Sequence, residues 1–216
     1  MSVLAHTSPP HSPAFFSPSK QAVFTLGLGL GAVAQSQGVR LGLAESCTGG
    51  LASAWVTAVS GSSAWFEGGV VSYSNALKAA LLSVPSDALA HHGAVSLPVA
   101  EAMARGLSGR FSEAYGPQSP YRWATAAITG IAGPAGGSEA KPVGLVCFAW
   151  QMPDKTLSRQ ACRFSGDRQS VQRQAAWWAL QGLFSRLVAS TTGPADRTAA
   201  RKRLGPESDA PEIRGA

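Results

Sequence analysis

The sequence predicts a single α/β domain, a three-layer α/β/α sandwich around a mostly parallel or mixed central sheet. Short apolar runs typical of strands alternate with segments whose apolar residues recur every three or four positions, as on a helix. The chain has 216 residues, 45% of them hydrophobic, which suits one domain and is short for two. We place this domain at residues 19–190, between a Pro-rich leader (1–18) and a tail (191–216) rich in Pro, Gly and charge, and expect both ends to be disordered.

The first half of the domain is predicted from helical spacing, short β runs and turn residues. Leu26, Leu30 and Val33 share one face of a helix that ends at Gly38. Each glycine inside this helix costs about 1 kcal/mol relative to alanine, so a phosphate-cradling loop at 27–31 is an alternative, although no strand precedes it. The expected elements, in order, are a helix over 19–37, a strand over 39–44, a helix carrying Leu51, Trp55 and Val59, a β-like run over 65–73, and a helix capped by Ser74 and Asn75.

The second half is predicted in the same way. A helix is indicated by four apolar residues spaced four apart, which form one stripe: Val99, Met103, Leu107 and Phe111. Residues 123–128 and 143–150 are continuous apolar runs, typical of buried strands. Residues 156–164 are partly polar, which suits an edge strand, and Asp167 opens a last helix that reaches Leu187.

The charge distribution argues against a nucleic-acid partner. The formal net charge is +6, but the cations are dispersed, and the tightest basic run (201–203) lies in a tail that also carries acidic residues. A nucleic-acid binder is expected to gather its cations on one stripe with aromatic residues between them. A mild excess of positive charge instead suits a small anionic ligand.

The cysteine pattern and the lengths of the apolar runs predict a cytoplasmic protein that does not enter a membrane. Cys47, Cys147 and Cys162 form no CxxC pair and cannot all pair with one another, which favours a reducing compartment. The run 22–34, which ends Ala-Val-Ala, imitates a signal-peptide core, so export is the alternative. No run approaches the ~18 apolar residues that span a bilayer.

Histidines offer few candidates for a catalytic base or a metal ligand. Two of the four lie in the leader, and the other two, His91 and His92, precede Gly93 in a predicted loop. None stands at metal-ligand spacing with Cys or an acidic residue, so we expect no metal. A Ser-His-Asp triad would have to use His91 or His92, so a serine hydrolase would more readily use Lys or Tyr as its base.

The turn after the first predicted strand is the best candidate for a nucleophile. A strand, a sharp turn, two glycines and a helix are how α/β enzymes present a hydroxyl, here that of Ser46, at the carboxyl end of a sheet. We expect Thr48, Gly49 and Gly50 to contact the ligand, with amides of the helix N-terminus holding an oxyanion or phosphate. The alternatives are that Ser46 and Thr48 merely cap the helix, or that Cys47 is the nucleophile.

Two further segments carry polar groups that could complete a site. Tyr73 ends a predicted strand, and Lys78 lies in the first turns of the next helix, where burial would favour its neutral, basic form. Thr129 and Gly130 open a glycine-rich loop between two buried strands. Such glycine density suits close approach of the backbone to a ligand, although a long flexible connector is the alternative.

Several of these motifs occur together and in order, and they cover residues 20–190. They are the segments 44–50 (Ala-Glu-Ser-Cys-Thr-Gly-Gly), 61–75, 128–134, 137–138, 141–144 and 164–168. In this combination the chain resembles the CinA carboxy-terminal domain family. The resemblance implies a nicotinamide-nucleotide amidase, which hydrolyses nicotinamide mononucleotide to nicotinate mononucleotide and ammonia without a cofactor.

The same resemblance implies roles for individual residues. Ser46 matches the family's nucleophile, and Tyr73 and Lys78 match the groups that activate it. Thr129 and Arg168 match substrate-side positions. We expect a homodimer. The competing hypothesis is a non-catalytic nucleotide-binding regulatory module linked to competence or the DNA-damage response.

Overall fold

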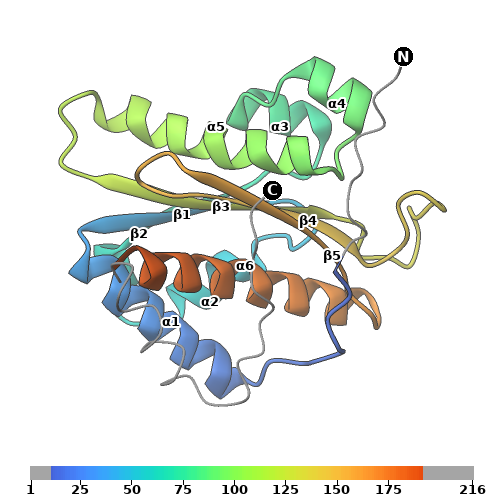
Figure 1. The fold of residues 1–216 in the computed structure, drawn as a ribbon, viewed down its shortest axis with the longest axis horizontal. Coiled ribbons are helices and arrows are strands. Elements are labelled where there is room, and N and C mark those ends of the chain that lie inside the picture. The colour runs from blue at the N-terminus through green and yellow to red at the C-terminus, as the bar shows by residue number, and fades with distance from the viewer. Residues whose placement is uncertain (1–10, 192–216) are drawn as a thin grey trace.

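The structure, a computed structural model, describes residues 11–191 and contains a five-stranded mixed sheet between two layers of helices (Figure 1). The strand order is β2-β1-β3-β4-β5; β1 is parallel to β2 and β3, whereas β4 is antiparallel to β3 and β5. The predicted three-layer α/β/α sandwich is therefore confirmed, with a mixed sheet. The strands are β1 (Val39–Glu45), β2 (Phe66–Val71), β3 (Arg122–Gly130), β4 (Leu145–Gln151) and β5 (Leu157–Arg163).

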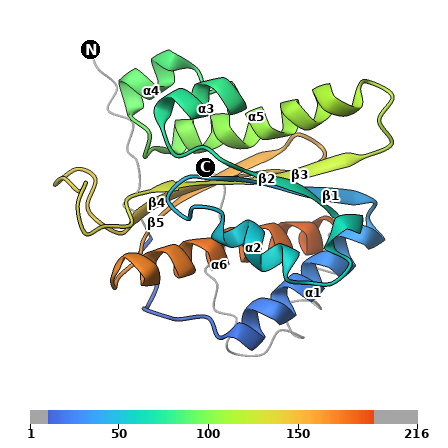
Figure 2. The ribbon, with the colours of Figure 1, turned by 180° about the vertical axis from the view of Figure 1, so that it is seen from behind.

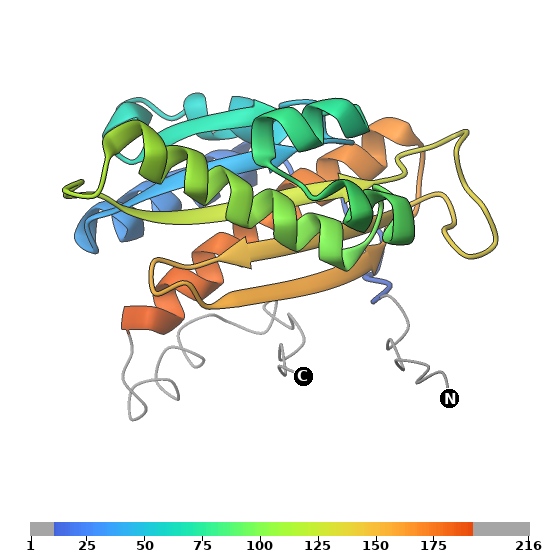
Figure 3. The same cartoon turned by 90° about the horizontal axis from the view of Figure 1, so that it is seen from above.

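Three helices cover each face of the sheet (Figures 1 and 2). One hydrophobic cluster joins the sheet to α1, α2 and α6, and a second joins it to the layer that contains α5. Figure 3 shows α3, α4 and α5 lying over the sheet. The first layer consists of α1 (Lys20–Ser36), α2 (Leu51–Thr57) and α6 (Arg168–Thr191), and the second of α3 (Asn75–Leu82), α4 (Ser86–His92) and α5 (Leu97–Tyr115).

Ser74 and Asp167 begin their helices as predicted, and Ser19, the first residue of the expected helix over 19–37, caps that helix. The Ser19 and Ser74 hydroxyls accept the amides of Ala22 and Leu77, and Asp167 accepts the amide of Ser170. The prediction missed one helix, because α4 buries none of its residues and so has no apolar stripe. The loop predicted around His91 and His92 is thus the last turn of α4, which ends at Gly93.

The topology brings three chain segments to one edge of the sheet. Because β1, β2 and β3 are parallel, their carboxyl ends lie together, with β1 between the other two. The segments that leave these ends begin at Ser46, at Ser72 and at Ile131. The last of them, the loop 131–144, projects beyond the strand ends (Figures 1 and 3). Ligands of open α/β sheets bind at this edge.

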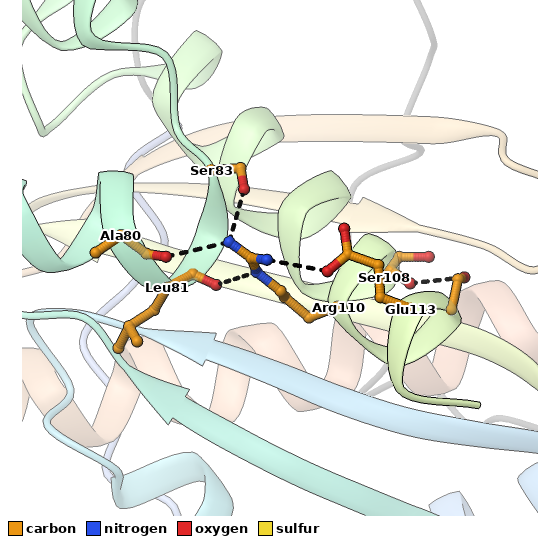
Figure 4. A network of polar contacts seen from close by, with 7 residues as sticks. Ala80, Leu81, Ser83, Ser108, Arg110 and Glu113 are labelled. Atoms are coloured by element: carbon orange, nitrogen blue, oxygen red, sulfur yellow. Dashed lines mark hydrogen bonds and ion pairs between the residues drawn. The ribbon is translucent and has the colours of Figure 1, made fainter. Parts of the chain in front are cut away.

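Helix α3 is fixed on α5 by a capping guanidinium and by close backbone contact. The Arg110 side chain donates to the carbonyls of Ala80 and Leu81 at the end of α3, and it pairs with Glu113 on its own helix (Figure 4). The helices approach so closely at Gly106 that a Cβ there would lie 1.7 Å from the Leu82 carbonyl oxygen. These contacts set the position of the helix that carries Lys78.

Residues 11–18 lie against the domain, so the structure differs from the expected boundary at residue 18. His11 donates its amide to the carbonyl of Ala161 and accepts the amide of Arg163, which forms one parallel bridge alongside β5 at Cys162. The Phe16 ring packs edge-on against Trp177 at 6.4 Å. Residues 1–10 and 192–216, where the rest of the leader and nearly all of the tail were placed, lie outside the described residues.

The apolar run that imitates a signal peptide is part of the core. It lies within α1, and two of its residues, Leu30 and Ala34, have no exposed surface. Cleavage after Ala34 would therefore remove most of a packed helix. Within residues 11–191, no helix combines the length and apolarity that a membrane crossing requires.

Candidate active site

Ser46 and Lys78 meet at the carboxyl edge of the sheet. The Lys78 Nζ lies 2.9 Å from the Ser46 Oγ, although the two residues are 32 positions apart in the chain. Ser46 is the first residue after β1 and is 7% exposed, while Lys78 projects from the first turn of α3 and is 1% exposed. Of the predicted catalytic residues, the fold brings these two into direct contact.

The surroundings of Lys78 suit a neutral amine. Its Nζ also contacts the backbone carbonyl oxygens of Ser72, at 2.6 Å, and Tyr73, at 3.3 Å. A neutral amine has two N–H bonds for these two carbonyls, which leaves its lone pair for the Ser46 hydroxyl proton. Burial lowers the pKa of Lys78 below its ordinary value.

Glu45 organises the turn that carries Ser46, and sequence reasoning did not identify it. The side chain is fully buried, and its two oxygens accept five hydrogen bonds. One oxygen accepts the Thr48 hydroxyl at 2.7 Å, and the other accepts both the amide and the hydroxyl of Ser53. The signal was an acidic residue directly before Ser46 and close to a helix N-terminus.

The glycine turn therefore contributes differently from what the sequence predicted. The Thr48 hydroxyl and the Gly50 amide both bind Glu45, so they are not available to a ligand. Thr48, Gly49 and Gly50 are also not among the residues that line the cavity beside Ser46. Gly50 has φ +97°, a conformation that glycine adopts at little cost and that lets the chain turn into α2.

Tyr73 and Arg168 form one side of the cavity mouth. The Arg168 guanidinium donates to the Tyr73 hydroxyl at 3.1 Å and to the Gly133 carbonyl at 2.8 Å. It thereby joins α6, the end of β2 and the glycine-rich loop. The contact of Tyr73 with Lys78 is through its backbone carbonyl, so the proton of Ser46 can reach Lys78 without passing through the phenol.

Thr129 supports the opposite wall. Its buried hydroxyl donates to the carbonyl of Ala94 at 2.8 Å. The Lys141 ammonium donates to the carbonyl of His92 at 2.6 Å, so the segment 92–95 is held from both sides. Ala94 and Val95 line the cavity, and no pattern in the sequence had pointed to them.

The resulting cavity has a volume of about 230 Å³. Its walls are mostly small apolar side chains and backbone, with Lys78 and Arg168 as the basic side chains. Among the predicted site residues it brings together Ser46, Tyr73, Lys78, Thr129, Gly130 and Arg168. The remaining lining residues are Cys47, Ala94, Val95, Ile131, Ala132, Gly133, Ala135 and Gly136.

The alternative nucleophile and the histidine triad find little support in this geometry. Burial raises the pKa of the Cys47 thiol to about 12, so the reactive thiolate is scarce near neutral pH. His91 and His92 are exposed on α4 and do not line the cavity. In the part of the chain from residue 11 to residue 191, no group of three His, Cys, Asp or Glu side chains could hold a metal ion.

Comparisons with known proteins agree with this architecture. The nicotinamide-nucleotide amidohydrolase PncC of Escherichia coli (strain K12) is 44% identical over 163 residues, which cover 75% of this chain and 93% of that protein. A CinA-like protein of Mycobacterium sp. (strain JLS) is 46% identical over 146 residues, 68% of this chain and 32% of that longer protein.

Solved structures show the same fold. The competence/damage inducible protein CihA from Agrobacterium tumefaciens has a TM-score of 0.70 at 33% identity, covering 79% of this chain and 97% of that one. A CinA superfamily protein from Klebsiella pneumoniae 700603 has a TM-score of 0.68, also at 33% identity, covering 77% of this chain and 98% of that one. The model of the CinA C-terminal domain matches residues 26–187. The chain therefore belongs to the CinA C-terminal domain family.

Proposed function

We propose that this chain is a nicotinamide-nucleotide amidase that hydrolyses the carboxamide of nicotinamide mononucleotide, with Ser46 as nucleophile and Lys78 as base. The observation that carries the proposal is the 2.9 Å contact between the Lys78 Nζ and the Ser46 Oγ, at the wall of a cavity. The 44% identity to a nicotinamide-nucleotide amidohydrolase supports the substrate class. A module that only binds a nucleotide has no need of a buried lysine against a serine hydroxyl.

The reaction begins with attack of the Ser46 hydroxyl on the amide carbon. Neutral Lys78 takes the hydroxyl proton, and the oxygen forms a tetrahedral adduct whose carbonyl oxygen carries the negative charge. The amide of Ser46 is bonded to the Ile128 carbonyl, so we assign this oxyanion to the amide of Cys47, the next residue, which lines the cavity. Loss of one such donor costs about 2.7–4 kcal/mol of transition-state stabilisation.

Ammonia then leaves, and water completes the turnover. Protonated Lys78 returns its proton to the leaving nitrogen as the carbon–nitrogen bond breaks, which yields a nicotinoyl ester on Ser46. Lys78, neutral again, takes a proton from the water that attacks the ester. As the ester bond breaks, Lys78 gives this proton to the Ser46 oxygen, and nicotinate mononucleotide leaves.

Arg168 is the residue that we assign to the phosphate. The volume of about 230 Å³ is below the ~300–1,000 Å³ typical of ligand pockets, so it suits the nicotinamide end with the phosphate towards the mouth. Arg168 stands there exposed, with a guanidinium suited to bidentate contact with phosphate oxygens. The Gly133 and Tyr73 contacts direct this guanidinium across the mouth.

The decisive experiment is ammonia release from nicotinamide mononucleotide by the purified chain. Ser46→Ala should abolish release, while Cys47→Ala, the matched change at the neighbouring position, should retain most of it because the buried thiol takes no part. An inactive Cys47→Ala variant beside an active Ser46→Ala variant would reject the assignment. Tight binding of the nucleotide without any ammonia release by the unaltered chain would favour the regulatory module instead.

The assembly state and the compartment stay predictions of the sequence. The expected homodimer can be tested by light scattering of the purified chain.

A further inference from the structure

We infer that Glu45 is a positioning residue of this reaction: its buried carboxylate holds the 46–50 turn so that the Ser46 hydroxyl lies against Lys78. The inference rests on the proposed function for its main readout. Glu45 does not line the cavity, and its side chain accepts five hydrogen bonds from the turn and from α2. It therefore acts through Ser46 and does not touch the substrate.

The contacts of Glu45 connect β1, the turn and α2. Oε2 accepts the Thr48 hydroxyl at 2.7 Å and the amides of Gly50 at 3.1 Å and Ala52 at 3.2 Å. Oε1 accepts the Ser53 amide at 2.8 Å and its hydroxyl at 2.7 Å. Both oxygens act only as acceptors, which is the behaviour of an ionised carboxylate, because a protonated one would donate.

The backbone of Glu45 and Ser46 is bound to both neighbouring strands. The carbonyl of Glu45 accepts the amide of Ser72, and the amide of Ser46 donates to Ile128 at the end of β3. The same Ser72 presents its carbonyl to the Lys78 Nζ at 2.6 Å. One short run of hydrogen bonds thus joins the Glu45 backbone, Ser72, Lys78 and Ser46, while the Glu45 side chain fixes the far side of the turn.

Glu45 also explains where an anionic ligand cannot bind. The amides at the start of α2 already bind the Glu45 carboxylate. A second negative charge beside this buried carboxylate is disfavoured. The substrate phosphate is therefore directed away from α2 and towards Arg168.

The test compares variants of similar side-chain size by their turnover and by the reactivity of their Ser46 hydroxyl. Glu45→Gln replaces one acceptor oxygen with an NH₂ group that faces donors, and Thr48→Val removes one of the donors without changing the size of the side chain. Thr48→Ser keeps the hydroxyl and is the conservative rescue. Thr125→Val is the control, because the buried Thr125 hydroxyl donates to Ala104 on α5 and does not line the cavity.

Two quantities are measured for each variant at the same concentration of folded protein, with the folded fraction taken from its melting curve. The first is kcat and KM for nicotinamide mononucleotide. The second is the rate at which phenylmethylsulfonyl fluoride sulfonylates Ser46, followed by intact mass. In that step the serine oxygen bonds to sulfur, fluoride leaves and Lys78 takes the proton, so the rate reports the Ser46–Lys78 contact without the natural substrate.

We expect Glu45→Gln to lower kcat and the sulfonylation rate by about 100-fold, since a misplacement near 1 Å has that effect. Thr48→Val should lower both by about tenfold and Thr48→Ser by less than about twofold, with KM little changed throughout. Thr125→Val should lower only the melting temperature.

The outcomes separate the two proposals. Wild-type kcat and sulfonylation in both Glu45→Gln and Thr48→Val, or losses matched by Thr125→Val, would overturn the positioning role. If Glu45→Gln does not fold, Thr48→Val against Thr48→Ser decides. If the unaltered chain is sulfonylated but releases no ammonia, the proposed substrate is wrong. The sulfonylation rates of the variants then still test the positioning role of Glu45. An unaltered chain that neither releases ammonia nor is sulfonylated would count against both the proposed function and the positioning role of Glu45.

Discussion

At the scale of single residues, the candidate site contains a lysine whose charged form is disfavoured by burial. Lys78 is 1% exposed and has three oxygen neighbours, of which two are carbonyls and one is the Ser46 hydroxyl. An ordinary lysine, with a pKa near ~10.4, is almost wholly protonated at neutral pH and is a poor base. Burial is the largest cause of the lowered pKa of Lys78, so the proposed role of Lys78 as a base depends directly on packing.

The first prediction concerns the pH dependence of turnover. The profile of kcat/KM should show an ascending limb well below pH ~10.4, because the proposed mechanism requires neutral Lys78 in the free enzyme. Lys78→Arg should lose the limb and most of the rate, since guanidinium does not give up its proton. Near-normal turnover in Lys78→Arg would mean that the lysine acts only through its charge, and another base would have to be sought.

The second prediction concerns the stability cost of the same lysine. Because its pKa is lower in the folded chain than in the unfolded chain, the unfolded chain binds more protons between the two values. The free energy of unfolding should therefore rise with pH in that window, by about 1.36 kcal/mol for each unit that separates the two pKa values. Lys78→Met should be more stable than the unaltered chain at neutral pH and lack this rise. Denaturant titrations at several pH values measure both.

The third prediction concerns the Tyr73 hydroxyl, which contacts Arg168 and not Lys78. Tyr73→Phe removes one hydrogen bond that directs the guanidinium, worth about 0.5–1.5 kcal/mol, so KM should rise while kcat is largely kept. The opposite pattern, a lost kcat with an unchanged KM, would restore the phenol as a relay between Ser46 and Lys78. Steady-state kinetics with nicotinamide mononucleotide distinguishes the two.

At the scale of elements, the site depends on how closely α3 approaches α5. Lys78 lies on α3, and the end of that helix is held by Arg110 of α5 and by backbone contact at Gly106 (Figure 4). The Leu82 carbonyl oxygen that a Cβ at Gly106 would meet is backbone and cannot turn aside. A change at this contact should therefore move α3 and the base together.

The fourth prediction follows from this contact. Gly106→Ala should destabilise the fold by about 1–3 kcal/mol through overpacking, and it should lower kcat as α3 shifts. Gly109→Ala is the matched control on the same helix, because a Cβ there meets nothing within 4 Å. The free energy of unfolding of that variant should rise by about 0.5–1 kcal/mol because of the higher helix propensity of alanine, and its activity should be kept. Equal effects of the two substitutions would show that α5 adjusts without moving α3.

At the scale of the whole molecule, residues 11–18 extend the domain beyond the region that the family model matches. They add a bridge to the edge strand β5, place Phe16 against Trp177, and bring the carbonyl of Pro18 to Arg173 on α6. The edge of a sheet is where such a segment can pair, because its backbone groups are otherwise open to solvent.

The fifth prediction tests this segment by stepwise shortening. A chain that begins at residue 19 loses the two hydrogen bonds of His11, and at about 1 kcal/mol each its melting temperature should fall by about 4–8 °C. A chain that begins at residue 11 keeps these contacts and should melt close to the full chain. Calorimetry of the three proteins is sufficient, and identical melting of all three would show that the segment contributes nothing to stability.

The sequence by itself determined the fold class, most element positions and the identity of the Ser46 and Lys78 segments. Apolar spacing and capping residues are local signals, so they survive in a single sequence, and Ser74 and Asp167 begin their helices as predicted. The tertiary structure decided which of these groups meet. Parallel pairing of β1 with β2 and β3 brings the segments of Ser46 and Lys78 together, and the packing of α6 brings Arg168 to the Tyr73 hydroxyl. Contacts between positions far apart in the chain depend on strand order and helix packing, which leave no mark in the local pattern of residues.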